Sequence, residues 1–285
     1  MNKQNLGGEK VYQSSKYMTE FIAKKMICDV GKRMYDRGYV ASNDGNISVR
    51  IGQNAIICTP TGVSKGFMMP DMLVKINMKG EKIAGKLKQS SEVKMHLRVF
   101  EENPEVLAVV HAHPPAATSF SIAGIELNQA VLTEAVVLLG NVPIAPYATP
   151  GTNEVPDSIT PYCKDHNAVL LANHGALTWG ADLLEAYHRL ESLEHYSKIL
   201  MYTTRIFEKT NELNCDQVEK LLEIRKKIGI KAGGVPSCSI NEKKAETSND
   251  NKKCPPENSV NINTKEEVIS SIITKVTENI LRNYK

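Results

Sequence analysis

The sequence predicts an α/β (α+β) fold of three layers, in which helices flank a central, mostly antiparallel sheet. Two kinds of segment alternate up to Ile228: short runs of β-branched and aliphatic residues, typical of strands, and longer stretches with apolar residues at every third or fourth position, as in amphipathic helices. Turns that contain glycine or proline separate most of them. We therefore expect one layered domain, covering residues 1–232.

Composition and charge exclude several classes of protein. Hydrophobic residues make up 41% of the chain and charged residues 24%, as in soluble globular proteins. The net charge of +3 predicts no nucleic-acid partner and no membrane partner. No apolar run approaches the roughly 18 residues that span a bilayer, and the N-terminus lacks the apolar core of a signal peptide. The six cysteines show no CxxC spacing, which predicts reduced thiols in the cytoplasm rather than disulfides or a zinc cluster.

The N-terminal part predicts one helix and a series of short strands. A helix is expected from Ser14 to Arg37, because its apolar stripe has helical spacing and Gly38 can end it. The stripe comprises Met18, Phe21, Ile22, Met26, Val30 and Met34. Strands are expected at 46–50, 55–58, 72–76 and 82–84. The small and hydroxyl-bearing residues at Gly45-Asn46 and at 59–62 (TPTG) are each explained by a simple hairpin turn.

The segment Ser90-Ser91-Glu92 leads into a helix that should extend to Glu101. Either serine is expected to cap this helix, which would direct hydroxyls and first-turn N–H groups to one place and create an anion site. A plain N-cap, with Glu92 favoured by the helix dipole, explains the segment equally well.

Two buried-strand runs end in histidines. The first, 106–115, ends in His111 and His113, whose imidazoles leave the strand by the same face because strand side chains alternate. The second ends at His174, which Gly175 follows. One such pair is compatible with ordinary surface or core histidines. Together with the carboxylate of Glu92, the three predict a metal site with an acid or base beside it.

The second half of the domain predicts further helices around one buried strand. Helices are expected at 115–123, 152–163, 180–207 and 216–228, and a strand at 168–173. The run 134–139 is compatible with helix or strand, and the prolines of 142–152 restrict that run to a sheet edge. The inward side of the last helix should comprise Val218, Leu221, Leu222, Ile224 and Ile228.

The composition changes at Gly233. Residues 233–264 are too polar to bury a core and predict a disordered linker, whereas residues 265–285 predict an amphipathic helix. The apolar stripe of this helix comprises Val268, Ile269, Ile272, Ile273, Val276, Ile280 and Leu281. Few Lys or Arg residues lie on its polar face, which disfavours membrane binding, and a helix that folded back would leave the long tether unexplained. We therefore expect a docking helix for another protein.

Six motifs, in order, resemble the class II aldolase/adducin family over about residues 15 to 230. They are Gly45–Arg50, Thr59–Gly62, Ser90–Glu92, His111–His113, Ala145–Ala148 and Asn173–Gly175. Within the family, the chain is most similar to aldolases that cleave L-fuculose 1-phosphate. That resemblance implies a homotetramer with sites between subunits and a zinc-dependent cleavage to dihydroxyacetone phosphate and L-lactaldehyde.

The resemblance also implies roles for individual residues. His111, His113 and His174 would hold one Zn²⁺ per subunit, and Glu92 would be the base or proton shuttle. The substrate phosphate would lie among Asn46, Thr61, Gly62, Ser90 and Ser91. Family epimerases that act on pentulose 5-phosphates usually have aspartate after the two serines, so Glu92 favours an aldolase.

The chain departs from the fuculose enzymes at the aldehyde side. Aromatic residues are missing around Leu132 and Pro150, and a C-terminal tyrosine is missing near Ile228, so Tyr147 is the remaining candidate proton donor. Rhamnulose 1-phosphate and 5-deoxypentulose 1-phosphates are alternative substrates. A sugar-phosphate epimerase or dehydratase and a non-catalytic, adducin-like structural protein are the alternatives; retention of all three histidines and of Glu92 argues against the last.

The C-terminal part resembles an encapsulation peptide of bacterial microcompartment cargo. This resemblance implies a cytoplasmic location inside a microcompartment, with a shell protein bound through residues 265–285. Lactaldehyde is volatile and reactive, so confinement would suit the implied reaction.

Overall fold

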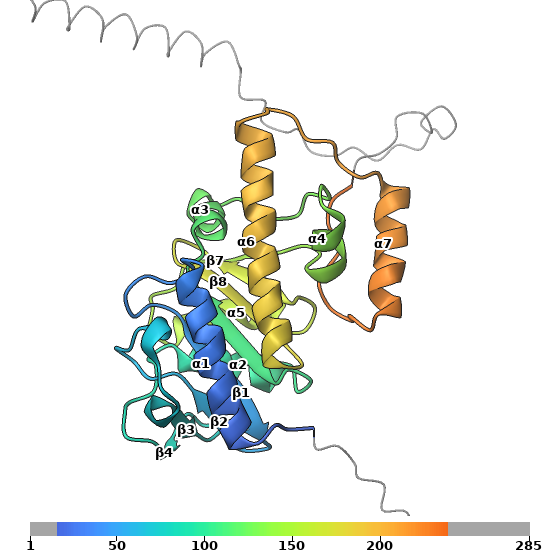
Figure 1. Cartoon of the computed structure of the whole chain (residues 1–285). Helices are drawn as coiled ribbons and strands as arrows, with labels where there is room; N and C mark the ends of the chain where they lie inside the picture. Colours follow the sequence, from blue (N-terminus) through green and yellow to red (C-terminus); the bar gives the residue numbers. More distant parts are fainter. Residues whose placement is uncertain (1–15, 239–285) are drawn as a thin grey trace, which may run out of the picture. The chain divides into compact units, whose positions relative to one another are not determined.

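The structure, a computed structural model, describes residues 16–238, and within that range it contains one eight-stranded sheet (Figure 1). The strands are β1 (Asn46–Gly52), β2 (Ala55–Cys58), β3 (Val74–Ile76), β4 (Lys82–Ala84), β5 (Ala108–Ala112), β6 (Ile144–Ala145), β7 (Ala168–Leu171) and β8 (Gly175–Gly180). The helices are α1 (Glu20–Asp36), α2 (Val93–Glu102), α3 (Pro115–Ala123), α4 (Thr133–Leu138), α5 (Glu154–Ile159), α6 (Leu183–Arg205) and α7 (Cys215–Lys227). Short 3-10 turns lie at Lys65–Phe67, Pro70–Met72 and Thr160–Tyr162.

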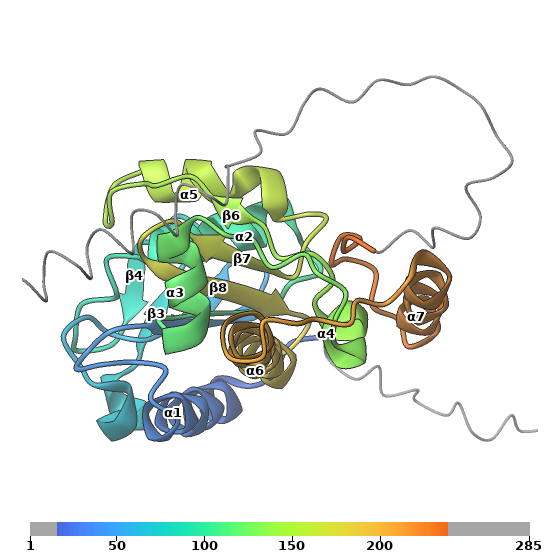
Figure 2. The same ribbon diagram turned by 90° about the horizontal axis from the view of Figure 1, so that it is seen from above.

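The sheet has the strand order β4-β3-β2-β1-β5-β8-β7-β6. All neighbouring strands are antiparallel except β6 and β7. Helices α1, α3 and α6 cover one face of the sheet, and α2 and α5 cover the other (Figure 2). The predicted three-layer fold with a mostly antiparallel sheet is therefore confirmed.

Alternate side chains of β5 enter the two cores. Ala108 and Val110 pack with the apolar residues of α1 and α6, whereas Val109 packs with those of α2. His111 continues this alternation, so its side chain leaves the sheet on the face that α2 covers. The side chain of His111 therefore points towards the start of α2.

Most elements fall where the sequence predicts them. The helix at Pro115–Ala123 has the expected bounds, the run at 134–139 is helical, and β6 is a two-residue edge strand. Strand β8 was not expected. It follows β7 through a tight turn in which Asn173 has a left-handed φ of 57°, a conformation that asparagine tolerates better than most residues. Among the described helices, none is long and apolar enough to cross a bilayer.

Two predicted apolar stripes are partly wrong. Phe21 and Ile22 of α1 are 77% and 46% exposed, because the first half of the helix packs through Ala23 and Ile27 instead, whereas the predicted Val30 and Met34 are buried. The buried positions are Ala23, Ile27, Val30, Gly31 and Met34. In α7, Ile224 and Ile228 are exposed, whereas Arg225 is buried and donates to the carbonyls of the last turn of α4. A cation at a helix C-terminus interacts favourably with the helix dipole, which explains a charged residue at this position.

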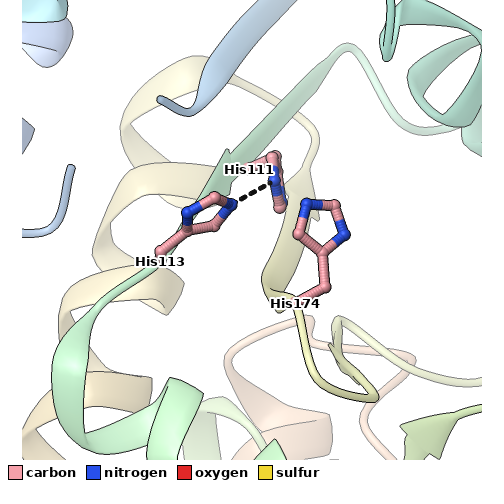
Figure 3. Close-up of side chains that lie close together, drawn as sticks. All are labelled: His111, His113 and His174. Atoms are coloured by element: carbon pink, nitrogen blue, oxygen red, sulfur yellow. Dashed lines mark hydrogen bonds between the residues drawn. The ribbon is translucent and has the colours of Figure 1, made fainter. Parts of the chain in front are cut away.

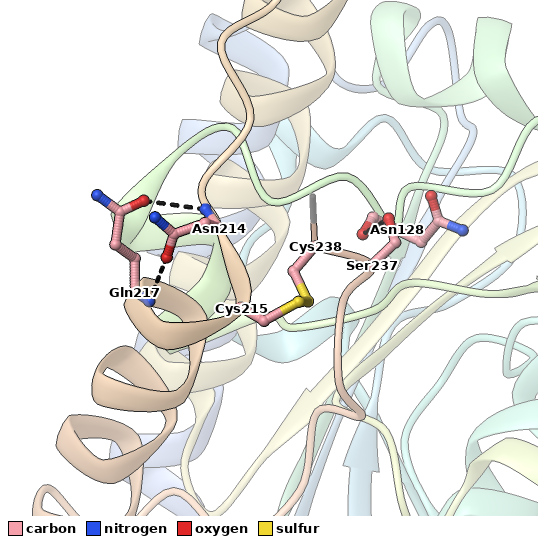
Figure 4. Close-up of a disulfide and its surroundings, with 6 residues drawn as sticks. All are labelled: Asn128, Asn214, Cys215, Gln217, Ser237 and Cys238. Carbon is pink, nitrogen blue, oxygen red and sulfur yellow. Dashed lines mark hydrogen bonds between the residues drawn. A yellow bond between two sulfur atoms is a disulfide. The ribbon is translucent and has the colours of Figure 1, made fainter. Parts of the chain in front are cut away.

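The prediction of reduced cysteines is wrong for one pair. Cys215 and Cys238 form a disulfide (Figure 4), whereas Cys28, Cys58 and Cys163 are free. Cys254 lies outside the described residues. The bonded pair is 23 residues apart, and only the return of the chain after α7 brings the two together, so cysteine spacing gave no sign of it.

Hydrogen bonds tie the segment before Cys238 to the domain. Gly233 N–H donates to Asp165 O at 2.9 Å, Asn141 N–H donates to Gly233 O at 2.8 Å, and Ser237 N–H donates to Asn128 O at 2.7 Å. Residues 233–238 fall within the predicted linker, but the structure attaches them to the domain. The linker beyond them and the helix at 265–285 lie outside the described residues.

We expect Cys215→Ser to lower the free energy of unfolding by about 2–4 kcal/mol, because the disulfide restricts the unfolded chain. Urea denaturation without reductant measures the change. Cys238→Ser should have the same effect and the double variant no larger one, whereas Cys28→Ser, which removes a half-buried free thiol, should change little. If Cys215 and Cys238 both react with a thiol reagent in the denatured, unreduced protein, no disulfide is present.

Candidate metal centre

Three histidines converge at the end of β5 (Figure 3). His111 lies in β5, His113 follows it, and His174 lies in the turn that leads into β8. Because β8 pairs with β5, this turn is held beside the end of β5. One ligand atom from each imidazole lies within 4.8 Å of the others. The structure thus brings together all three histidines of the predicted metal site.

Hydrogen bonding fixes which ring nitrogens face the centre. His111 Nδ1 lies 2.9 Å from Ala176 O, and His113 Nδ1 lies 3.5 Å from an Asp44 carboxylate oxygen. Both oxygens can only accept, so each Nδ1 carries the proton and each neutral ring has a bare Nε2. Asp44 is a site residue that the sequence did not single out, although it lies next to the Gly45-Asn46 motif.

The two bare nitrogens fit a cation between them. His111 Nε2 and His113 Nε2 are 3.1 Å apart, and two lone pairs at that distance repel unless a positive charge separates them. In a tetrahedral zinc site with Zn–N bonds of about 2.0–2.1 Å, neighbouring nitrogens lie roughly 3.3 Å apart. Three imidazoles are also a donor set that zinc accepts. The residues present therefore fit a divalent metal.

Burial keeps the histidines in the form that binds metal. It lowers the pKa of His111, which is fully buried, and it lowers the pKa of His113, with a further contribution from His174. Imidazoles with lowered pKa values are neutral at pH 7, and only the neutral ring can ligate.

Glu92 adds a carboxylate to the centre. Its Oε1 lies 3.2 Å from His174 Nε2 and its Oε2 lies 3.7 Å from His111 Nε2, while Asn46 Nδ2 donates to Oε2 at 2.8 Å. Burial by itself would raise the pKa of Glu92, but attraction between its carboxylate and a proton on His111 or His174 outweighs this effect and lowers the pKa. Oε1 is buried and contacts His174 Nε2, so the carboxylate lies within reach of a ligand that the histidines bind.

The turns that bear the predicted phosphate-binding residues lie side by side. Ser90 N–H donates to Thr59 O at 3.1 Å, and Thr61 N–H donates to Lys88 O at 3.0 Å. Asn46 faces His111 across the β1–β5 pairing and bonds to Glu92, so it adjoins the same turns. Thr61, Gly62 and Ser91 are exposed. Three of the five residues predicted to form the phosphate-binding cradle are therefore open to solvent, whereas Asn46 is buried and bonded to Glu92.

One expected feature of this cradle is wrong. Neither serine caps α2, because Glu92 itself occupies the cap position, and no side chain bonds to the first-turn N–H groups. The Ser90 hydroxyl instead accepts from Glu92 N–H at 3.3 Å. Tyr147, the candidate proton donor, is 64% exposed.

The buried residue His96, one helical turn after Glu92, was not predicted from the sequence. Its Nδ1 lies 2.8 Å from the Ser48 hydroxyl, and its Nε2 has no partner among the described residues. Burial lowers its pKa to about 3, despite the nearby Glu92, which raises it. The four-residue spacing from Glu92 was the available signal, since residues i and i+4 share a helix face.

The family model of the Class II Aldolase and Adducin N-terminal domain matches residues 25–201. A 3-oxo-tetronate 4-phosphate decarboxylase of Haemophilus influenzae is 33% identical over 186 residues, 64% of this chain and 88% of the relative. An L-fuculose phosphate aldolase of Methanococcus maripaludis is 35% identical over 182 residues, 64% of this chain and 94% of the relative. The solved structure of an L-fuculose 1-phosphate aldolase superposes with a TM-score of 0.67 at 27% identity, over 75% of this chain and all (100%) of that one.

We expect His96→Gln to flatten the acid side of the pH–stability curve of the metal-free protein. Folded His96 stays neutral down to about pH 3, whereas an unfolded histidine binds a proton below roughly 6.5, so stability falls as pH falls through that window. The residue should account for up to about 1.4 kcal/mol per pH unit. Urea denaturation at several pH values from 4 to 7 measures the slope. The exposed His188→Gln is the control, and equal slopes in all three proteins would contradict the assignment.

Proposed function

The chain belongs to the class II aldolase and adducin family, and on that premise we propose that it is a metal-dependent aldolase that cleaves L-fuculose 1-phosphate or a related ketose 1-phosphate. The products would be dihydroxyacetone phosphate and, from L-fuculose 1-phosphate, L-lactaldehyde. One observation supports this most directly: bare imidazole nitrogens converge on a point beside the ionised carboxylate of Glu92.

We further propose zinc as the metal, one ion per subunit, with His111, His113 and His174 as its ligands. When bound there, a divalent ion supplies Lewis acidity that stabilises negative charge on the substrate oxygens. The assembly would be a homotetramer with sites between subunits.

Glu92 is proposed as the proton shuttle. Cleavage breaks the bond between C3 and C4 of the ketose, so the C4 hydroxyl must lose its proton and C3, which keeps the electron pair, must gain one. The carboxylate lies beside the histidines, where it can accept the first proton and, once protonated, deliver it to C3. The bond from Asn46 holds the carboxylate in one orientation for both transfers.

The phosphate would occupy the cradle formed by Asn46, Thr61, Gly62, Ser90 and Ser91. Backbone N–H groups, an amide and hydroxyls are suitable donors to a phosphate. Because the cradle adjoins the histidines, a phosphate held there would place the carbonyl two atoms away near the metal.

A second candidate is decarboxylation of 3-oxo-tetronate 4-phosphate, which the relative in Haemophilus influenzae supports. Loss of CO₂ from this four-carbon acid leaves the same three-carbon fragment, which becomes dihydroxyacetone phosphate after protonation. Both reactions therefore need the same metal ligands and phosphate cradle. They differ in the leaving group, since CO₂ departs without loss of a hydroxyl proton.

We expect the zinc-loaded protein to release dihydroxyacetone phosphate from L-fuculose 1-phosphate. EDTA treatment should abolish release, and Glu92→Gln should slow it by at least about 100-fold, because the amide cannot accept the proton. A coupled assay for dihydroxyacetone phosphate measures the rates. Glu101→Gln, which changes an exposed glutamate of α2, is the matched control and should stay near the wild-type rate.

The same assay with 3-oxo-tetronate 4-phosphate decides between the two candidates. Release of CO₂ and dihydroxyacetone phosphate from this acid alone would replace the aldolase by a decarboxylase. Release from neither substrate, nor from other ketose 1-phosphates, by a zinc-replete protein would reject the proposed function.

We also propose that residues 265–285 bind a microcompartment shell protein and that a linker, which begins after residue 238, joins this helix to the catalytic domain. The amphipathic stripe and the polar tether before it support the proposal. Since residues 233–238 bond to the domain, a deletion that tests the tail should begin at residue 239.

Deletion of 239–285 should leave the kinetic constants nearly unchanged and abolish co-purification with co-expressed shell proteins. Ile269→Lys, on the apolar stripe, should weaken co-purification strongly, whereas Ser271→Lys, on the polar side, should not. Affinity pull-down followed by immunoblot measures the interaction. Co-purification of the deleted protein at the full-length level would reject the docking role.

A further inference from the structure

Lys65 is a charged side chain that the domain buries almost completely. It is 1% exposed, although lysine is rarely buried without a carboxylate partner. Its ammonium donates to two backbone carbonyls, Asn43 O at 2.8 Å and Val63 O at 2.7 Å. Among the ion pairs of the described residues, none includes Lys65. The positive charge is therefore held by neutral dipoles and not cancelled by direct contact with an acid.

The two carbonyls belong to the loops that bear the phosphate-binding candidates. Asn43 lies three residues before Asn46, and Val63 directly follows Thr61 and Gly62. One buried ammonium thus bonds to both loops. Through these bonds, Lys65 fixes the spacing between the two loops.

Helix α1 encloses this position. A side chain at Gly31 would place a Cβ 2.9 Å from Lys65 O and 2.4 Å from Met68 Cε, so only glycine lets the helix approach this closely. The approach excludes water from the lysine. Burial lowers the pKa of Lys65 to about 8, while Asp44 and Glu92 raise it, so the group is mostly charged at neutral pH.

The cradle itself presents no positive charge. Its side chains are an amide and hydroxyls, yet a sugar phosphate is close to a dianion at pH 7 and Glu92 adds a further negative charge nearby. A cation in a poorly solvated position acts over a longer distance than one in water, because the effective dielectric constant is lower. Lys65 is the buried cation that adjoins both loops.

We propose that Lys65 is a positioning residue for phosphorylated substrates: its ammonium holds the 43–46 and 61–63 loops together and supplies the positive charge that the cradle lacks. The inference rests on the proposed function, because it takes the cradle to be a phosphate site. It gives the domain a preference for phosphorylated ligands that does not require an exposed lysine or arginine.

The test compares dihydroxyacetone phosphate with dihydroxyacetone as ligands of the zinc-loaded protein by isothermal titration calorimetry. The two probes differ only in the phosphate. Loss of the charge in Lys65→Met should weaken dihydroxyacetone phosphate binding by about tenfold or more and leave dihydroxyacetone binding unchanged. Lys65→Gln should behave similarly, and Lys65→Arg, which keeps the charge, should retain most of the preference. The exposed Lys79→Met is the matched control and should bind like the wild type.

Every other outcome contradicts either this inference or the proposed function on which it rests. Equal weakening of both ligands, or failure of both neutral variants to fold, would make Lys65 a purely structural residue. If folded Lys65→Met still prefers dihydroxyacetone phosphate to dihydroxyacetone, the charge of Lys65 plays no part in phosphate binding. If the wild-type protein itself binds the two ligands equally, the cradle is not a phosphate site and the proposed function fails.

Discussion

The pairing of β5 with β1 on one side and β8 on the other determines where every polar group of the site lies. It sets Asn46 opposite His111 and holds the His174 turn beside the end of β5. A shift of one residue in either pairing would turn the side chains of that strand to the opposite face. A shift of β5 itself would turn His111 away from Glu92, which enters from α2 on one face only. The register of three strands is thus the constraint on which the chemistry depends.

The same register concentrates buried polar groups that are costly without a cation. An ionised carboxylate and neutral imidazoles with facing lone pairs destabilise a folded protein unless a positive charge satisfies them. A divalent ion would remove this cost, so metal binding and folding of the centre are expected to be coupled. Lys65 offers a complementary charge further back, buried under α1 and bonded only to carbonyls. With a metal bound, the site would therefore combine two positive charges: that of the ion and that of the buried Lys65 ammonium.

Local patterns in the sequence predicted the layers, most elements and the three histidines, because periodicity and strand alternation are properties of neighbouring residues. They did not predict β8, whose six residues include two glycines and show no clear alternation. Asp44, His96 and Lys65 were missed because burial and partners distant along the chain give these residues their roles. Lysine is ordinarily exposed, so nothing local marks Lys65. The disulfide was missed for the same reason, since Cys238 meets Cys215 only after the chain has turned back along α7.

The position of that disulfide has a mechanical consequence. Cys215 is the first residue of α7, and α7 packs on α4 through a small cluster of Ala130, Val136 and Val218 (Figure 1). The bond encloses residues 216–237 in a covalent loop, so tension on the chain beyond Cys238 cannot unravel them. Such a force would enter the domain at the N-terminal end of α7 and at the hydrogen bonds of Ser237, remote in sequence from the strands that bear the histidines. The domain could be held under load by its C-terminal chain while the register of β1, β5 and β8 stays undisturbed.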